Sequence, residues 1–357
     1  MELIETRHFG ALRAEWGALA LASGGDNIFG THSLLSRWLA HFGTPEHRLL
    51  LHRRAGRLTI GALVRTTPRG LTVERYALEV PPLVADRTER APFGPLLDGL
   101  ARRGDVDELV LYRLPATPAT RRALTSAAAG RFAVLARDPE SAHRIDLAQP
   151  FSAWLHSRPK KVRAELRRKA CKLGRELPAA ELRLLHGRAA GLAAIEEVER
   201  DGWKDQAGTA IISTDAERGF YGDLLDLPEA RLYLLDSGTA PLAYALCLAH
   251  RGRLYALKSS YAAAHAALSP GVVLFHRLLE HLAGTDPTLH TLELLGSDAR
   301  WKRELASRSP QLCTWQLLRT SPRRQIYAEA YRLMTARPRL HALVVRARAA
   351  AARSRRP

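Results

Sequence analysis

Cysteine is scarce in this sequence, and the spacing that would let cysteine hold a metal is absent. The 357 residues contain only Cys171, Cys247 and Cys313, which are far apart. No Cys-x-x-Cys pair and no cysteine–histidine cluster occurs, so we expect neither a zinc site nor a disulfide framework. An odd number of unpaired cysteines suits a reducing compartment. We therefore expect a cytoplasmic protein without a metal.

Long apolar runs are also absent. The stretch MELIETRHFG begins with acidic residues and has no apolar core, so we do not expect it to act as a signal peptide. No uncharged run approaches the ~20 residues that a membrane-spanning helix needs. The composition, with 46% hydrophobic and 25% charged residues, excludes a disordered chain and a collagen-like fibre.

Several common catalytic motifs are missing as well. The sequence has no Gly-x-Gly-x-x-Gly, no phosphate-binding Walker A loop, no His-Glu-x-x-His and no Gly-x-Ser-x-Gly. These absences argue against a dinucleotide-binding enzyme, a P-loop nucleotidase, a zinc peptidase and a serine hydrolase of the common type.

Lysine is rare beside arginine, with 7 lysines against 47 arginines. Arginine is the default cation of this chain, so a lysine points to a position that requires a compact ammonium group. Four lysines lie within residues 158–175, and the other three are Lys204, Lys258 and Lys302. Two of these three follow a tryptophan, as Trp203-Lys204 and Trp301-Lys302, which makes them candidates for a site.

The formal net charge of +18 is concentrated in two segments. Residues 158–175 carry a net charge of +8 and residues 321–357 carry +9, so the rest of the chain is nearly neutral. A basic helix within 151–175 suits contact with an RNA backbone such as that of tRNA. The tail 321–357 mixes arginine with apolar residues and suits an anionic membrane surface or packing on the body of the protein.

The order of predicted elements favours an α/β fold in two halves of similar size. We expect lobes at 1–150 and 151–320, followed by the basic helical tail 321–357. Helices are predicted at 12–21, 34–42, 95–103, 118–129, 151–175, 188–200, 217–225, 270–282 and 298–306. Strands are predicted at 48–52, 57–65, 71–77, 108–114, 132–136, 144–147, 231–236, 242–249, 253–259, 291–295 and 312–319.

The start of the helix at 270–282 is a candidate anion site. Ser269 suits an N-cap, Pro270 suits the first helical position, and Gly271 lets a ligand approach the first turn closely. Free amides and the positive end of the helix dipole favour a phosphate there. The alternative is an ordinary capped helix.

A strand with a polar end precedes this helix. Lys258, Ser259, Ser260 and Tyr261 follow an apolar run, and polar residues at the end of a buried strand often line a site. The alternative is a strand that emerges into solvent.

A carboxylate in the helix at 188–200 is a candidate base. Glu199 lies seven residues after Leu192 and therefore on the buried face of that helix, and Trp203-Lys204 follows it. A carboxylate directed at the interior has a raised pKa and can accept a proton. The alternative is an ion pair with a nearby arginine.

In this order, the features resemble the GNAT acyltransferases, and among them the cellulose-biosynthesis (CelD/BcsL-type) acetyltransferases with a Fem-like pair of GNAT lobes. The likeness covers about residues 150–320 well and 1–150 loosely. It is carried by Trp203-Lys204, Gly208, Phe220-Tyr221, Pro241-Leu242-Ala243, Lys258, Tyr261, Ser269-Pro270-Gly271, Leu292-Glu293-Leu294-Leu295-Gly296 and Lys302.

The resemblance implies two tandem lobes, each a mixed and largely antiparallel sheet flanked by helices. It also implies an acetyl-CoA or other acyl-CoA donor, with Glu199 as the base and Tyr261 as the acid for the leaving thiolate. A backbone amide of the strand at 254–259 would polarise the thioester carbonyl. The resemblance assigns donor binding to Leu257, Lys258, Ser259, Ser269, Gly271 and Val272. It assigns substrate binding to Trp203, Lys204 and Lys302. The two lysines would bind an anionic acceptor or fix local carboxylates.

Three functions stay open. The first is acyl transfer from acyl-CoA to an amine or hydroxyl, on a small molecule or on a sugar or cell-envelope (exopolysaccharide) precursor. The second is Fem-like aminoacyl transfer from aminoacyl-tRNA, with residues 158–175 on the tRNA. The third is a non-enzymatic role, in which both basic segments bind nucleic acid or the surface of the inner membrane.

Overall fold

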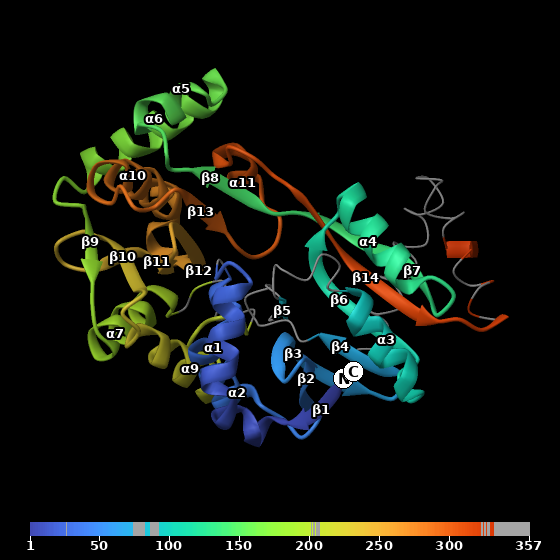
Figure 1. The fold of residues 1–357 in the computed structure, drawn as a ribbon. Coiled ribbons are helices and arrows are strands. Elements are labelled where there is room, and N and C mark those ends of the chain that lie inside the picture. The colour runs from blue at the N-terminus through green and yellow to red at the C-terminus, as the bar shows by residue number, and fades with distance from the viewer. Residues whose placement is uncertain are drawn as a thin grey trace, which may run out of the picture.

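The structure is a computed structural model that describes residues 1–25, 27–73, 83–85, 93–200, 202, 204, 208–322, 324, 326 and 329–331. Trp203, the end of the strand predicted at 71–77 and most of the tail 321–357 lie outside the described residues. Within the described part, the chain forms two sheets with helices on their faces, as Figure 1 shows. None of the helices described is long and apolar enough to cross a membrane.

The first sheet is built mainly from the amino-terminal half. In spatial order the described strands are β1 (Glu2–Glu5), β2 (His47–Arg54), β3 (Arg57–Thr67), β4 (Gly70–Val73), β6 (Glu108–Pro115), β14 (Gln311–Arg319) and β7 (Phe132–Ser141), and β5 (Leu83–Ala85) pairs with β3. Its helices are α1 (Arg13–Ala22), α2 (His32–Phe42), α3 (Phe93–Arg103) and α4 (Pro118–Ala128), with short 3-10 turns η1 (Thr6–Leu12) and η2 (Ile28–Gly30). Leucines of α3 and α4 pack on one face of the sheet, while Trp16 of α1 and Trp38 of α2 pack on the other.

The second sheet is built mainly from the carboxy-terminal half. Its described strands, in spatial order, are β8 (His143–Asp146), β13 (Thr291–Leu294), β12 (Arg253–Tyr261), β11 (Pro241–His250), β10 (Ala230–Asp236) and β9 (Glu181–Leu185). One face packs on α10 (Pro270–Thr285) and the other on α7 (Arg188–Glu199) and α9 (Asp215–Leu225). The core under α7 and α9 continues into that of α1 and α2, so the two lobes share one apolar layer.

Both sheets repeat one order of elements. In the first, antiparallel strands lead to β4, and β6 pairs parallel to β4 after the helix α3. In the second, antiparallel strands lead to β12, and β13 pairs parallel to β12 after the helix α10. This repetition confirms the predicted fold class of two tandem α/β lobes with mixed sheets flanked by helices.

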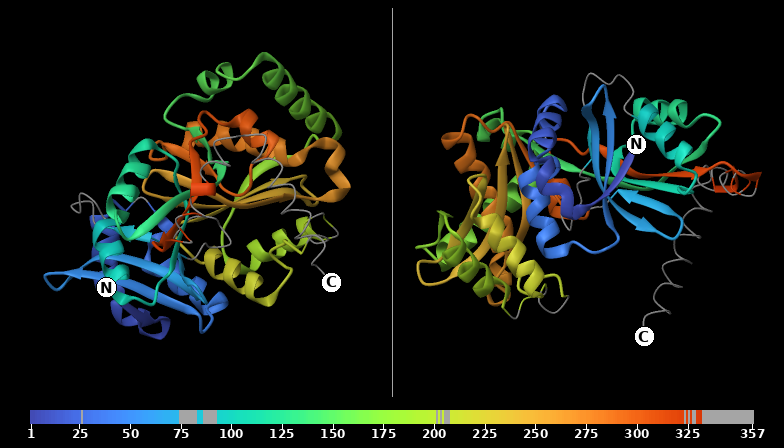
Figure 2. Two further views of the ribbon diagram at one scale, coloured as in Figure 1. Left: turned by 90° about the vertical axis from the view of Figure 1, so that its right-hand side faces the viewer. Right: turned by 60° about the horizontal axis from the view of Figure 1, so that its bottom comes forward.

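The two lobes exchange strands. β14, from the end of the described chain, pairs with β6 on one side and β7 on the other, inside the first sheet (Figures 1 and 2). β8 pairs with β13 at the edge of the second sheet. Strand pairing thus crosses the boundary predicted at residue 150 in both directions, because hydrophobic periodicity identifies a strand but not its neighbours.

The single basic helix predicted at 151–175 is wrong in one respect. The structure has two helices, α5 (Phe151–His156) and α6 (Lys160–Glu176), which meet at Arg158-Pro159. Proline has no amide hydrogen and disfavours helical geometry in the residue before it, so the first helix ends there and the second begins after it. Both helices lie on the outer side of the second lobe, in green in Figure 2.

Candidate functional site

The strands β12 and β13 diverge and leave one edge of β12 open. Their parallel pairing runs from Arg253 opposite Thr291 to Ala256 opposite Leu294. β12 then continues to Tyr261, with no strand beside it on that edge in the described part of the chain. Backbone groups on such an edge are free to bind an extended ligand.

The backbone groups that face the open edge can be assigned from the ladder. The amide of Ala262 donates to the carbonyl of Leu242 on β11 at 2.9 Å. Because backbone direction alternates along an antiparallel ladder, Ser260 also faces β11. Ser259 and Tyr261 therefore direct their N–H and C=O groups toward the open edge.

The first turn of α10 lies opposite this edge. Ser269 stands at the N-cap as predicted, but its backbone is left-handed, with φ of 54°, and its side chain makes no capping bond. Its carbonyl accepts from the amides of Val272 at 3.0 Å and Val273 at 3.2 Å. Since Pro270 has no amide hydrogen, the N–H of Gly271 is the amide of this turn that stays available to a ligand among the described residues.

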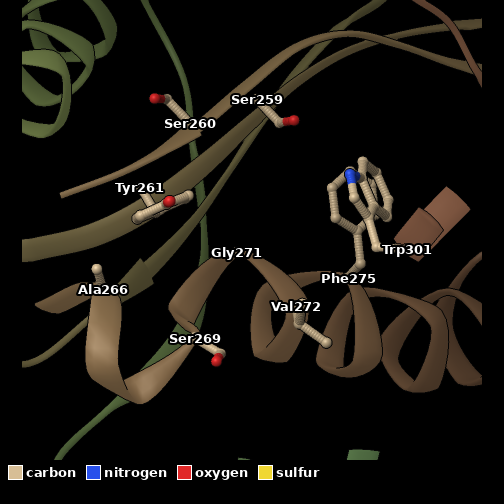
Figure 3. A pocket seen from close by; sticks show the side chains of 9 residues that line it. All are labelled: Ser259, Ser260, Tyr261, Ala266, Ser269, Gly271, Val272, Phe275 and Trp301. Atoms are coloured by element: carbon tan, nitrogen blue, oxygen red, sulfur yellow. The ribbon is translucent and has the colours of Figure 1, made fainter. Parts of the chain in front are cut away.

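A cavity of about 250 Å³ opens between β12 and the start of α10 (Figure 3). Two aromatic rings form part of its lining. They belong to Phe275 and Trp301, and their centres lie 4.8 Å apart. The lining residues are Ser259, Ser260, Tyr261, Ala266, Ser269, Gly271, Val272, Phe275 and Trp301. Of the predicted donor-binding residues, Ser259, Ser269, Gly271 and Val272 line this cavity, and so does the predicted acid Tyr261.

Two other predicted donor-binding residues do not line the cavity. Leu257 is buried in the core shared with the first lobe. It lies at a β-bulge, because Lys258 pairs with Leu246 and Ala256 pairs with the next residue, Cys247. Lys258 donates to the carbonyl of Thr209 at 3.0 Å, on the α9 side of the sheet. A bulge of this kind turns the following side chains onto new faces, which simple alternation along a strand does not reveal.

Glu199 is fully buried, as its position on α7 predicts, but its partners are not arginines. One carboxylate oxygen accepts from the hydroxyl of Tyr244 at 2.5 Å, and the other accepts from the amide of Ile211 at 2.6 Å. The Nζ of Lys204 lies 3.8 Å from the first oxygen. Burial and the adjacent carboxylate raise the pKa of Tyr244 well above its usual value, so its hydroxyl stays a donor.

Lys204 joins this buried carboxylate to the open edge of β12. Its Nζ donates to the carbonyl of Ser259 at 2.5 Å, and only 8% of the residue is exposed. Burial lowers the pKa of Lys204 from 10.5 to about 8, although the charge of Glu199 opposes the change. Lys258 and Lys302 lower it further by repulsion between like charges.

This pKa predicts a stability change with pH. Between about pH 8 and 10.5 the unfolded chain keeps the Lys204 proton that the folded chain has lost, so Lys204 adds to stability as the pH rises through that range. We expect the unfolding temperature of the unmodified protein, relative to that of Lys204→Met, to increase as the pH rises through this range. A constant difference between the two, measured by thermal unfolding, would show an ordinary lysine.

Lys302 holds the main chain that follows β13. Its Nζ donates to the carbonyls of Leu295 at 2.5 Å and Ser297 at 2.9 Å, just after β13, and lies 5.7 Å from the ring centre of Trp301. Lys204 and Lys302 were predicted to bind an anionic acceptor or to fix local carboxylates, but both donate to main-chain carbonyls, and only Lys204 also lies near a carboxylate, that of Glu199. Direct contact of either with an acceptor remains a prediction.

Sequence reasoning missed four residues of the site, one of them Ala266 of the cavity lining. Phe275 and Trp301 form the aromatic part of that lining, and Tyr244 supplies the hydroxyl that holds Glu199. Trp301 could have been found, because it precedes one of the rare lysines. Tyr244 lies within a continuous apolar strand, where nothing in the local pattern separates it from a core residue.

A family model matches part of the chain. Residues 160–303 match a family model described as "Acetyltransferase (GNAT) domain". This segment holds α7, the open strand and the start of α10. The match and the fold together support an acyltransferase. No curated protein matches the sequence.

Solved structures share the fold over most of the chain. FemX is 11% identical, with a TM-score of 0.58 over 92% of this chain and 100% of that one. The C-terminal domain of a putative lysylphosphatidylglycerol synthetase from Agrobacterium fabrum is 11% identical, with a TM-score of 0.56 over 88% and 93%. L-PGS from Bacillus licheniformis is 13% identical, with a TM-score of 0.50 over 85% and 96%. At these identities the likeness concerns the fold.

Proposed function

We propose that this protein transfers an acetyl or other acyl group from an acyl-CoA thioester to an amine or hydroxyl acceptor by direct attack. One observation carries the proposal: the open edge of β12 runs beside the first turn of α10, with a cavity between them. An extended thioester arm would pair with the edge, and its phosphates would lie at the helix start.

The donor would be held by backbone groups. The N–H of Ser259 or of Tyr261 faces the cleft and would donate to the thioester carbonyl, which gains negative charge during attack. The N–H of Gly271 and the positive end of α10 would bind the pyrophosphate. Phe275 and Trp301 would exclude water from the acyl end.

Proton transfer is assigned to two side chains. The acceptor nitrogen or oxygen attacks the carbonyl carbon, the carbon–sulfur bond breaks, and the thiolate takes a proton from Tyr261, which lines the cavity. Glu199 remains our candidate base. Because it is buried, the acceptor proton would reach it through Lys204, whose Nζ lies between Glu199 and the cleft.

The acceptor class and location rest on resemblance. The likeness to cellulose-biosynthesis acetyltransferases favours a sugar or cell-envelope precursor, and an acceptor anchored in the envelope would suit a cytoplasmic enzyme at the inner-membrane surface. Two of the structural neighbours carry the names FemX and lysylphosphatidylglycerol synthetase. The basic segment 321–357 would support attachment to anionic lipid.

Thermal unfolding with a panel of ligands tests the donor. Acetyl-CoA, longer acyl-CoAs, tRNA and anionic vesicles are added separately at moderate salt, because a ligand that binds only the folded state raises the unfolding temperature. We expect stabilisation by CoA thioesters. Stabilisation by tRNA alone would contradict this proposal and favour aminoacyl transfer. Stabilisation by vesicles alone would contradict it and favour a protein that binds a membrane surface.

Aminoacyl-tRNA is the second candidate donor, and the outer face of α6 favours it. Five exposed cations lie on this helix, at Lys160, Lys161, Arg167, Arg168 and Arg175. Their spacing places them along one side of the helix. If this face binds tRNA, affinity falls steeply with salt, and glutamine at these five positions reduces that slope.

A further inference from the structure

Lys204 and the proposed thioester share one residue of β12. Its Nζ donates to the carbonyl of Ser259, while the N–H of Ser259 faces the same open edge. We infer that Lys204 is itself an acyl acceptor, so that the enzyme acylates this buried lysine from its own acyl thioester donor. This inference rests on the proposed function.

The geometry brings the two reacting atoms together. In an extended strand the N–H and C=O of one residue point the same way, and they are separated by about 3 Å. A carbonyl oxygen held by the N–H of Ser259 therefore lies next to an amine held by its C=O. The amine nitrogen is then within roughly 4 Å of the carbonyl carbon, close to the separation of a near-attack conformer.

The surroundings of Lys204 favour its neutral, nucleophilic form. The groups that face it are Glu199 on α7, Tyr244 on β11, Lys258 on β12 and Lys302 on α11 (Arg300–Leu305). Its pKa of about 8 leaves a larger neutral fraction near neutral pH than an exposed lysine has. Glu199, 3.8 Å away, can accept a proton that the nitrogen releases.

The reaction balances without another reactant. The ammonium first loses a proton, and the amine attacks the thioester carbon. The carbon–sulfur bond breaks, the nitrogen loses a second proton, and one proton goes to the thiolate. The products are an acyl-lysine amide, free CoA thiol and one proton in solution.

The product would close the donor cleft. The amide N–H of acylated Lys204 can still donate to the carbonyl of Ser259, and the new acyl carbonyl can accept from the Ser259 N–H. The N–H of Ser259, proposed to bind the thioester carbonyl of the donor, is then occupied by the protein's own side chain. Acylation of Lys204 would therefore be an inhibitory modification.

Peptide mass spectrometry of the full-length protein after incubation with acetyl-CoA tests the inference. We expect acetyl-lysine at Lys204 in at least about tenfold excess over Lys258 and Lys302, because Lys204 is held at Ser259 beside the bound thioester, whereas the other two donate to the carbonyls of Thr209 and Leu295. The rate of labelling should rise with pH and level off above about 8. Acetyl phosphate, which lacks the CoA arm, should not reproduce the preference.

Two variants separate the outcomes. Lys204→Arg keeps the charge and cannot be acylated, whereas Lys258→Arg is the matched control and should leave Lys204 labelled. If acetyl-CoA stabilises the protein but Lys204 stays unlabelled, the inference fails and the proposed donor survives. If acetyl-CoA neither stabilises nor labels the protein, both fail. Weaker binding of acetyl-CoA to protein already acetylated at Lys204, measured by titration calorimetry, supports the closing role, and equal binding before and after labelling contradicts it.

Discussion

Replacing Glu199 with alanine should lower the free energy of unfolding by about 3–5 kcal/mol. The substitution removes a fully buried carboxylate that accepts from Tyr244 and Ile211 and lies 3.8 Å from the ammonium of Lys204. The alanine variant leaves a hydroxyl and an amide unpaired, and the buried lysine loses its counter-charge. Because that charge raises the pKa of Lys204, the pKa should fall further below about 8 in the variant.

Denaturant unfolding measures this effect, and Glu196→Ala is the matched control. Glu196 lies one turn earlier on α7 and bonds Arg218 at 2.7 Å near the surface. Exposed ion pairs contribute little, so this control should cost less than about 1 kcal/mol. Equal losses in the two variants would contradict the buried network described for Glu199.

Replacing Gly271 with aspartate should weaken acetyl-CoA binding by about a hundredfold, which is about 2.7 kcal/mol. A Cβ at this position lies 3.4 Å from the ring of Tyr261, an ordinary contact, so the backbone has room for it. The new carboxylate would lie at the helix start, where the donor's phosphates are proposed to bind, and would repel them. The fold should not suffer, because an acidic residue in the first helical turn is favourable.

The control for this variant lies at the other end of the same helix. Gly284 has open space around its missing side chain, so Gly284→Asp adds the same charge to α10 far from the cavity. Titration calorimetry with acetyl-CoA should find its affinity unchanged. If both aspartate variants bind acetyl-CoA as the unmodified protein does, the phosphates do not lie at Gly271.

One side of the cavity was predictable because its residues are local in sequence. Ser259, Tyr261, Ser269 and Gly271 lie within one strand-to-helix connection, where turn chemistry and capping preferences identify the site. The partners of Glu199 were not predictable, since Tyr244 comes from a strand 45 residues away. Strand exchange could not be predicted either, because the pattern of β14 gives the faces of a strand and not its neighbours in the sheet.

The rarity of lysine identified three residues that share one kind of contact in the structure. Lys204, Lys258 and Lys302 each donate to a main-chain carbonyl and each lies within 6.0 Å of an aromatic ring centre. A compact ammonium suits such carbonyls better than a planar guanidinium, which matches carboxylates and phosphates. Scarcity therefore identified positions that need an ammonium, while the partners came from the tertiary structure.

Amide hydrogen exchange with and without acetyl-CoA tests most directly whether the donor binds along the open edge of β12. We expect added protection at Ser259 and Tyr261 and at Gly271, with little change along α6. The amide of Ser260 should be protected in both states, because it faces β11. Protection confined to α6, or none on β12 at acetyl-CoA concentrations that stabilise the protein, would contradict this account.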